Sequence, residues 1–136
     1  MILVDTSVLI DFLNDINNKY TAALNDIISD RIPYGITAFT YQEILQGAAS
    51  EKDFLILKEY LSTQKIYVLK NGLQSHEDAA FIYMKCRKKG LTIRSTIDIL
   101  IAQTAIENDL YLLHNDRDFE NIAKVITSLK IYKVTA

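Results

Sequence analysis

The chain begins MILVDTSVLID over residues 1–11, and this stretch indicates the fold class. Ile2-Leu3-Val4 is a short, wholly apolar run, which is typical of a strand buried on both faces of a parallel sheet. Asp5 follows it directly, and residues 7–13 then have the apolar spacing of a helix. A buried strand, an acid and a helix in immediate succession predict an α/β domain with its first carboxylate at the end of its first strand.

The same alternation continues along the rest of the chain. Further strands are predicted at 34–37, 66–69, 110–113 and 131–134. Further helices are predicted at 20–28, 38–49, 54–61, 75–89, 96–108 and 119–125. Alternating strands and helices favour a mostly parallel central sheet of about four to five strands, flanked by helices on both faces. Because 136 residues suit one domain and no repeat or long linker interrupts them, we expect a single domain over 1–136.

Composition excludes several classes of protein. Hydrophobic residues make up 49% and charged residues 24% of the chain, as in an ordinary folded domain. The single cysteine, Cys86, excludes an internal disulfide framework and a cysteine-rich zinc site. No stretch approaches the ~20 apolar residues of a membrane span, and the first residues lack the basic segment of a secretory signal. We therefore expect a cytoplasmic protein without a membrane segment.

Four acids stand in apolar surroundings. Asp5 follows the first strand, and Asp116 follows strand 110–113 after only two residues, so both are expected at the same edge of the sheet. Glu43 and Asp98 lie in predicted helices among apolar neighbours. No Lys or Arg is placed nearby in the sequence to pair with them, and a buried carboxylate is costly unless it is paired or binds a metal. This pattern favours a site for a hard cation, Mg²⁺ or Mn²⁺.

Each acid also has a simpler interpretation. Asp5 is placed to cap the helix that follows it, and either Asp116 or Asp118 is placed to cap the helix that begins near 119. Glu43 fits a solvated helix position, and Asp98 fits a helix cap or a partner for a buried hydroxyl. The sequence leaves these alternatives open for each acid taken alone.

Four segments, in this order, resemble the PIN domain and specifically the VapC toxins of bacterial and archaeal toxin–antitoxin pairs. They are MILVDTSVLID at 1–11, ITAFTYQEILQG at 36–47, GLTI at 90–93 with IDILIA at 97–102, and NDRDF at 115–119. The resemblance covers almost the whole chain. It implies a PIN-like α/β fold and a Mg²⁺-dependent endoribonuclease, with Mn²⁺ as a substitute ion, that leaves 5′-phosphate and 3′-hydroxyl ends.

The resemblance also assigns residues and partners. By position it makes Asp5, Glu43, Asp98 and Asp116 the catalytic, metal-binding acids, with Asp118 and Thr6 in supporting roles. The chain departs from the family pattern at His114, where many members have Ser or Thr, and at Arg94-Ser95, where many have a small residue. His114 is expected to adjoin the site. The implied partners are an RNA substrate, a cognate antitoxin that holds the toxin inactive, and a second copy in a homodimer.

A basic segment covers the end of the predicted helix 75–89 and the residues just after it. The formal net charge of −2 supplies no general attraction for a polyanion, so RNA binding needs a local patch or a metal ion. Five cations without an intervening acid offer such a patch: Lys85, Arg87, Lys88, Lys89 and Arg94. The alternative is that these cations merely complement the dipole at the helix end.

Three competing functions remain at this stage. A metal-free mechanism would use His76 and His114 as acid and base. A catalytically silent module would bind RNA or a partner protein and use its acids only as caps or contacts. A receiver-like domain would use an aspartate as phosphoacceptor, although no second acid stands two residues after Asp5, where an aspartyl phosphatase needs one.

Overall fold

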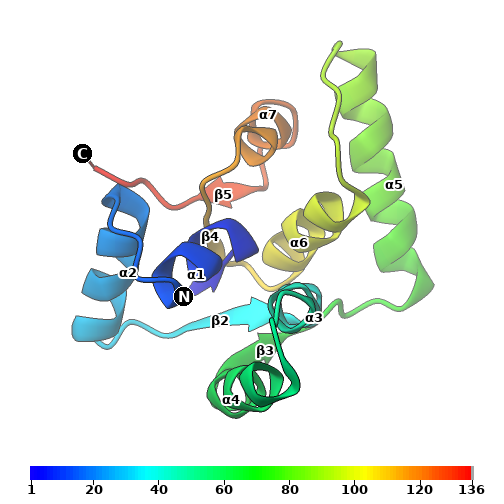
Figure 1. The fold of residues 1–136 in the computed structure, drawn as a ribbon. Helices are drawn as coiled ribbons and strands as arrows, with labels where there is room; N and C mark the ends of the chain where they lie inside the picture. The colour runs from blue at the N-terminus through cyan, green and yellow to red at the C-terminus, as the bar shows by residue number, and fades with distance from the viewer. Residues whose placement is uncertain (136) are drawn as a thin grey trace.

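Five parallel strands form the central sheet of the computed structural model, which describes residues 1–135 (Figure 1). The strands are β1 (Ile2–Val4), β2 (Tyr34–Thr37), β3 (Lys65–Tyr67), β4 (Tyr111–Leu113) and β5 (Lys130–Ile131). They lie in the order β3-β2-β1-β4-β5, and every neighbouring pair runs parallel. The expected parallel sheet is confirmed, at the upper end of the expected strand number.

Helices cover both faces of this sheet, as predicted. They are α1 (Thr6–Leu13), α2 (Lys19–Ser29), α3 (Ala38–Gln46), α4 (Glu51–Leu61), α5 (Leu73–Lys88), α6 (Thr96–Glu107) and α7 (Arg117–Val125). Alternate residues of the central strands divide between two apolar cores, because successive strand side chains point to opposite faces. Ile2 and Val4 pack with residues of α1 to α4, whereas Leu3 and Leu112 pack with residues of α5, α6 and α7. None of the helices within residues 1–135 is long and apolar enough to cross a bilayer.

The strand order reverses its direction at the centre of the sheet. From β1 the chain moves outward through β2 to β3, then returns to lay β4 and β5 on the other side of β1. In open parallel sheets, ligands bind beyond the carboxyl ends of the strands at this reversal point. Here that point lies between β1 and β4, the two strands that Asp5 and Asp116 follow.

Element boundaries differ from the prediction by a few residues, for local reasons. Helix α4 begins at Glu51 instead of Phe54, because Ser50 caps it by accepting a hydrogen bond from the amide of Asp53. The last strand is only Lys130–Ile131, and Tyr132 instead packs against the core beneath α1 to α4. The predicted stop of α5 is confirmed, since Gly90 has the positive φ of +76° that favours glycine after a helix.

Candidate metal centre

Hydrogen bonds join the segments that follow β1 and β4, so two distant parts of the sequence form one edge of the site. The amide of Asp5 donates to the carbonyl of Leu113 at 2.9 Å. The hydroxyl of Ser7 accepts from the amide of Asn115 at 3.0 Å and donates to Asp5 Oδ2 at 2.6 Å. These bonds fix the carboxylate of Asp5 relative to the loop that leads to Asp116.

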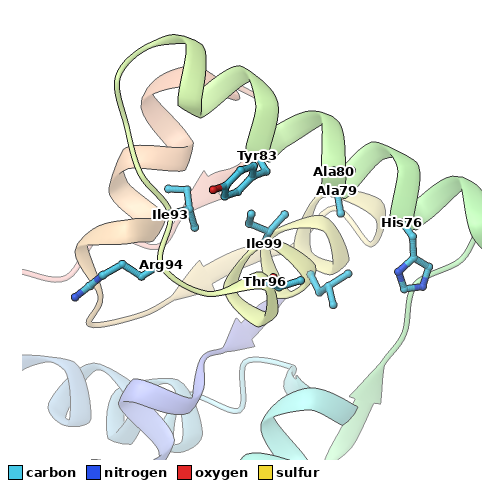
Figure 2. Close-up of a pocket in the computed structure, with 9 residues that line it drawn as sticks. His76, Ala79, Ala80, Tyr83, Ile93, Arg94, Thr96 and Ile99 are labelled. Atoms are coloured by element: carbon cyan, nitrogen blue, oxygen red, sulfur yellow. The ribbon is translucent and has the colours of Figure 1, made fainter.

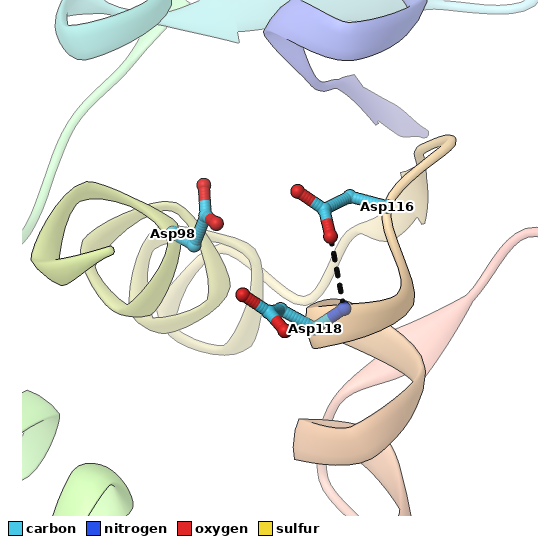
Figure 3. Close-up of side chains that lie close together, drawn as sticks. All are labelled: Asp98, Asp116 and Asp118. Atoms are coloured by element: carbon cyan, nitrogen blue, oxygen red, sulfur yellow. Dashed lines mark hydrogen bonds between the residues drawn. The ribbon is translucent and has the colours of Figure 1, made fainter. Parts of the chain in front are cut away.

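Three carboxylates meet at this edge. Asp98, Asp116 and Asp118 each offer one oxygen, and these oxygens all lie within 4.8 Å of one another (Figure 3). Asp98 comes from the first turn of α6, and the other two come from the start of α7. Clustered carboxylate oxygens are the donor set of a hard divalent cation, so the residues present fit Mg²⁺ or Mn²⁺.

The carboxyl group of Asp98 carries the clearest electrostatic signature of the cluster. Its pKa is raised from an ordinary 3.8 to about 7, first by burial and then by the negative charges of four neighbours: Asp5, Asp116, Asp118 and Glu43. No hydrogen bond from another of the described residues stabilises its charged form. The other four acids of the sequence prediction therefore all lie within electrostatic range of Asp98.

Asp5 is both a helix cap and a member of the acidic site. Its side chain is only 3% exposed and accepts from the amide of Ser7, which starts α1 in the way that the capping alternative proposed. Burial nevertheless raises the pKa of Asp5, even though hydrogen bonds from Ser7 and Thr6 lower it, and the charge of Glu43 adds to the rise. Capping and site membership are thus compatible properties of the same side chain.

Asp116 and Glu43 are held by similar local contacts. Asp116 caps α7, accepting from the amide of Asp118 at 3.0 Å (Figure 3). Glu43, exposed on α3, accepts from the hydroxyl of Thr6 at 2.8 Å, and that hydroxyl also shares a hydrogen bond of 3.0 Å with Thr40. Thr6 therefore links the end of β1 to α3 and orients the Glu43 carboxylate.

The sequence offered no local Lys or Arg to pair with the acids, but a distant arginine pairs with two of them. Arg94 Nε lies 3.3 Å from Asp118 Oδ2, and its Nη2 lies 3.4 Å from Asp116 Oδ1. Its backbone amide also donates to Asp118 Oδ2 at 3.2 Å. The sequence grouped Arg94 with the basic segment because of its neighbours, but the loop after α5 brings it to the carboxylates instead.

His114 adjoins the site as expected but is turned into the protein. Its Nδ1 accepts from the amide of Asp116 at 3.1 Å, and its Nε2 lies 3.3 Å from Glu120. The side chain is buried against Phe119, and this burial lowers the pKa of the imidazole. His114 is therefore a neutral ring that supports the backbone around Asp116.

His76 and His114 line two different pockets. A pocket of about 430 Å³ between α5 and α6 is lined by His76, Tyr83 and Ile99 (Figure 2). His114 instead lines a pocket of about 390 Å³ with Glu120 and Tyr132. Because the two imidazoles line different pockets, the arrangement does not favour the metal-free acid–base pair.

The remaining cations of the basic segment stay at the end of α5. They are Lys85, Arg87, Lys88 and Lys89, and all four are exposed. Three of them occupy the last turn, where they complement the helix dipole as the alternative proposed. The loop from this end runs back to the start of α6, which carries Asp98 (Figure 1). A role in RNA binding stays a prediction.

Sequence reasoning missed two features of this site. Ser7 was read only as the start of a helix, yet its hydroxyl bonds both Asp5 and the β4 loop. Asp118 was given a supporting role, yet it is one of the three clustered carboxylates. The sequence could have indicated this, because Asp118 is the second residue after the Asp116 cap and those two positions lie close together at the start of a helix.

Comparisons with known proteins agree on one family and one fold. The family model for the PIN domain matches residues 2–125. Ribonuclease VapC11 of Mycobacterium tuberculosis is 29% identical over 134 residues, which cover 92% of this chain and 93% of that protein. A structure of VapBC2 from Rickettsia felis, bound to a promoter DNA fragment, aligns with a TM-score of 0.74 and 20% identity over 97% of this chain and 98% of that one. A structure of VapBC-1 from nontypeable Haemophilus influenzae aligns with a TM-score of 0.72 and 23% identity, covering 98% of each chain.

Proposed function

Because this chain belongs to the PIN domain family, we propose that it is a metal-dependent endoribonuclease that acts as the toxin of a toxin–antitoxin pair. The observation that carries the proposal is the carboxylate cluster of Asp98, Asp116 and Asp118 beside Asp5 and Glu43, at the carboxyl ends of β1 and β4. Relatives with matching length are named VapC ribonucleases, which supports RNA as the substrate.

Each acid has a proposed role that follows from its contacts. Asp98, Asp116 and Asp118 would hold Mg²⁺, or Mn²⁺ in its place, because their oxygens already converge. When bound, such an ion activates a water molecule for attack on phosphorus and offsets charge on the phosphate. Asp5, which accepts a hydrogen bond from Ser7, would complete the ligand set. Glu43, which accepts one from Thr6, would ligate the ion or orient the attacking water.

Hydrolysis by an oriented water leaves a phosphate on one RNA fragment and a hydroxyl on the other. We propose that the phosphate stays on the 5′ end and that the 3′ oxygen leaves, as the family resemblance implies. The exposed cations at the end of α5 would bind neighbouring RNA phosphates, because such contacts position a nucleic acid without reading its sequence.

A protein partner is also proposed. Several structural neighbours are VapBC complexes by name, and another is a toxin–antitoxin complex from Klebsiella pneumoniae. On α4, three consecutive apolar side chains are exposed: Phe54, Leu55 and Ile56. Such a patch supports contact with another protein, and we propose a cognate antitoxin and a second copy of this chain as its partners. The cytoplasmic location stays a prediction.

The direct test is cleavage of a defined RNA by the purified chain, with the ends of the products mapped. We expect cleavage that requires Mg²⁺ or Mn²⁺, stops with EDTA, and is lost in Asp116→Asn. Asp26→Asn is the matched control, because Asp26 is exposed on α2 and lies outside the cluster. Metal binding without cleavage of any RNA would instead favour the catalytically silent binding module, and cleavage that persists in EDTA would reject the proposed chemistry.

A further inference from the structure

Arg94 pairs with carboxylates that a divalent cation would also bind. Among residues 1–135, Arg94 is the one positively charged side chain within ion-pair distance of Asp98, Asp116 or Asp118. Its guanidinium contacts Asp116 and Asp118 at once, at 3.4 Å and 3.3 Å. These are two of the three carboxylates whose oxygens converge.

We propose that Arg94 is a built-in counter-ion of the carboxylate cluster, which competes with the divalent cation and is released from Asp116 and Asp118 when the cation binds. This inference rests on the proposed function for the assignment of the cluster to a metal. It adds a residue that regulates metal loading, through a positive charge supplied by the chain itself.

The geometry of Arg94 suits a group that can leave. Its backbone is fixed, because its amide donates to Asp118 Oδ2. Its side chain is 71% exposed, so the guanidinium can move into solvent without uncovering apolar surface. Arg94 is one of the residues that line the α5–α6 pocket, and Figure 2 shows its side chain extending away from the other labelled residues.

A divalent cation would neutralise the carboxylates more completely than Arg94 does. Arg94 pairs with Asp116 and Asp118 but leaves Asp98 without an ion pair among the described residues. Asp98, Asp116 and Asp118 would together hold a divalent cation, which carries twice the charge of a guanidinium, whereas partly exposed arginine pairs are weak and easily exchanged. The released guanidinium would lie at the edge of the cluster with its charge free for a phosphate oxygen.

The experiment measures Mn²⁺ affinity by isothermal titration, without RNA, in the wild type and in Arg94→Gln. Removing the competing charge should tighten Mn²⁺ binding by about threefold to tenfold, in keeping with weak exposed ion pairs. Arg117→Gln is the matched control, since Arg117 lies between the same two acids in sequence but forms no ion pair within the described residues. A purely structural role of Arg94 would weaken Mn²⁺ binding, and equal affinities would show that it does not compete.

The two proposals fail in different ways. If the wild type binds no Mn²⁺, the metal site itself is absent and the proposed function fails. If the wild type binds Mn²⁺ and Arg94→Gln binds it no more tightly than Arg117→Gln does, only the counter-ion inference fails.

A second measurement detects the release directly in the unmodified chain. Phenylglyoxal labels accessible guanidinium groups, and mass spectrometry of the digested protein locates the label. We expect Mn²⁺ to increase labelling of Arg94 severalfold while labelling of Arg117 stays constant. Equal labelling of Arg94 with and without Mn²⁺, at concentrations that saturate the site, would show that the guanidinium stays in place and would overturn the inference.

Discussion

Replacing Asp98 with Asn should make the metal-free protein more stable, because it removes the charge that the cluster tolerates least. The difference between an ordinary pKa of 3.8 and the value of about 7 corresponds to about 4 kcal/mol if none of it is screened. Asp98 is partly exposed, so solvent screens much of this cost, and we expect a gain of about 1–2 kcal/mol at pH 8. For a chain of this length, that gain raises Tm by about 3–8 °C.

The sign of the pH dependence follows from the raised pKa. Between pH 3.8 and about 7, folded Asp98 retains a proton that the unfolded chain has lost, so wild-type stability falls as the pH rises through this range. The full cost is present above pH 7 and absent below pH 3.8. The advantage of Asp98→Asn should therefore be largest at pH 8 and should shrink steadily toward pH 4.

Calorimetric scans in EDTA from pH 8 to pH 4 measure this difference, with Asp26→Asn as the control for loss of an exposed charge. Saturating Mg²⁺ should stabilise the wild type and reverse the order of the two proteins, because only the wild type keeps the full set of carboxylates. A variant that is less stable than the wild type at pH 8 in EDTA would refute the reasoning. It would mean that the Asp98 carboxylate makes a favourable contact.

Three further predictions concern separate contacts. Thr6→Val removes the hydroxyl that holds Glu43 at 2.8 Å, so RNA cleavage should fall about tenfold with no loss of fold, whereas Thr63→Val, in an exposed turn, should leave cleavage unchanged; equal rates in all three proteins would contradict the role of Thr6. Neutralising Lys88 and Lys89 to Gln should reduce the slope of log K against log salt for RNA binding by about two units, and an unchanged slope would exclude them as phosphate contacts. Gly35→Ala places a Cβ 2.5 Å from the backbone oxygen of Lys65, so urea unfolding should show a loss of about 2–3 kcal/mol, and a neutral result would show that β2 and β3 separate easily.

The sequence predicted that Asp5 and Asp116 lie at one edge of the sheet, because Asp5 follows a buried strand directly and Asp116 follows another after two residues. Ile2-Leu3-Val4 and the apolar run before Asp116 are short and uninterrupted, which identifies central parallel strands. Once β1 and β4 are parallel neighbours, their carboxyl ends share one edge, and Asp5 and Asp116 must lie near each other. That inference needed only the direction of the strands.

Contacts made through loops were beyond the same reasoning. Arg94 stands 22 and 24 residues before its two partners, and its pairing depends on the path of the loop between α5 and α6. The hydrophobic periodicity of the sequence does not predict the path of this loop. The tautomer of His114 could not be predicted from the sequence either, because it depends on the amide of Asp116 beside Nδ1 and on Glu120 beside Nε2.

Apolar patterning also overestimated the final strand. Residues 131–134 alternate in the manner of a strand, but only the first of them pairs with β4. Tyr132 and Val134 pack against the core on the α1–α4 face instead, so the tertiary contact overrides the local preference.

In the proposed centre, acids from the end of β1, from α3 and α6 and from the start of α7 converge to bind a divalent cation. A crystal grown with Mn²⁺ and measured near the manganese absorption edge tests this most directly. We predict an anomalous peak coordinated by oxygens of Asp98, Asp116 and Asp118. A map with no peak among these carboxylates, at a Mn²⁺ concentration that supports RNA cleavage in solution, would contradict the account.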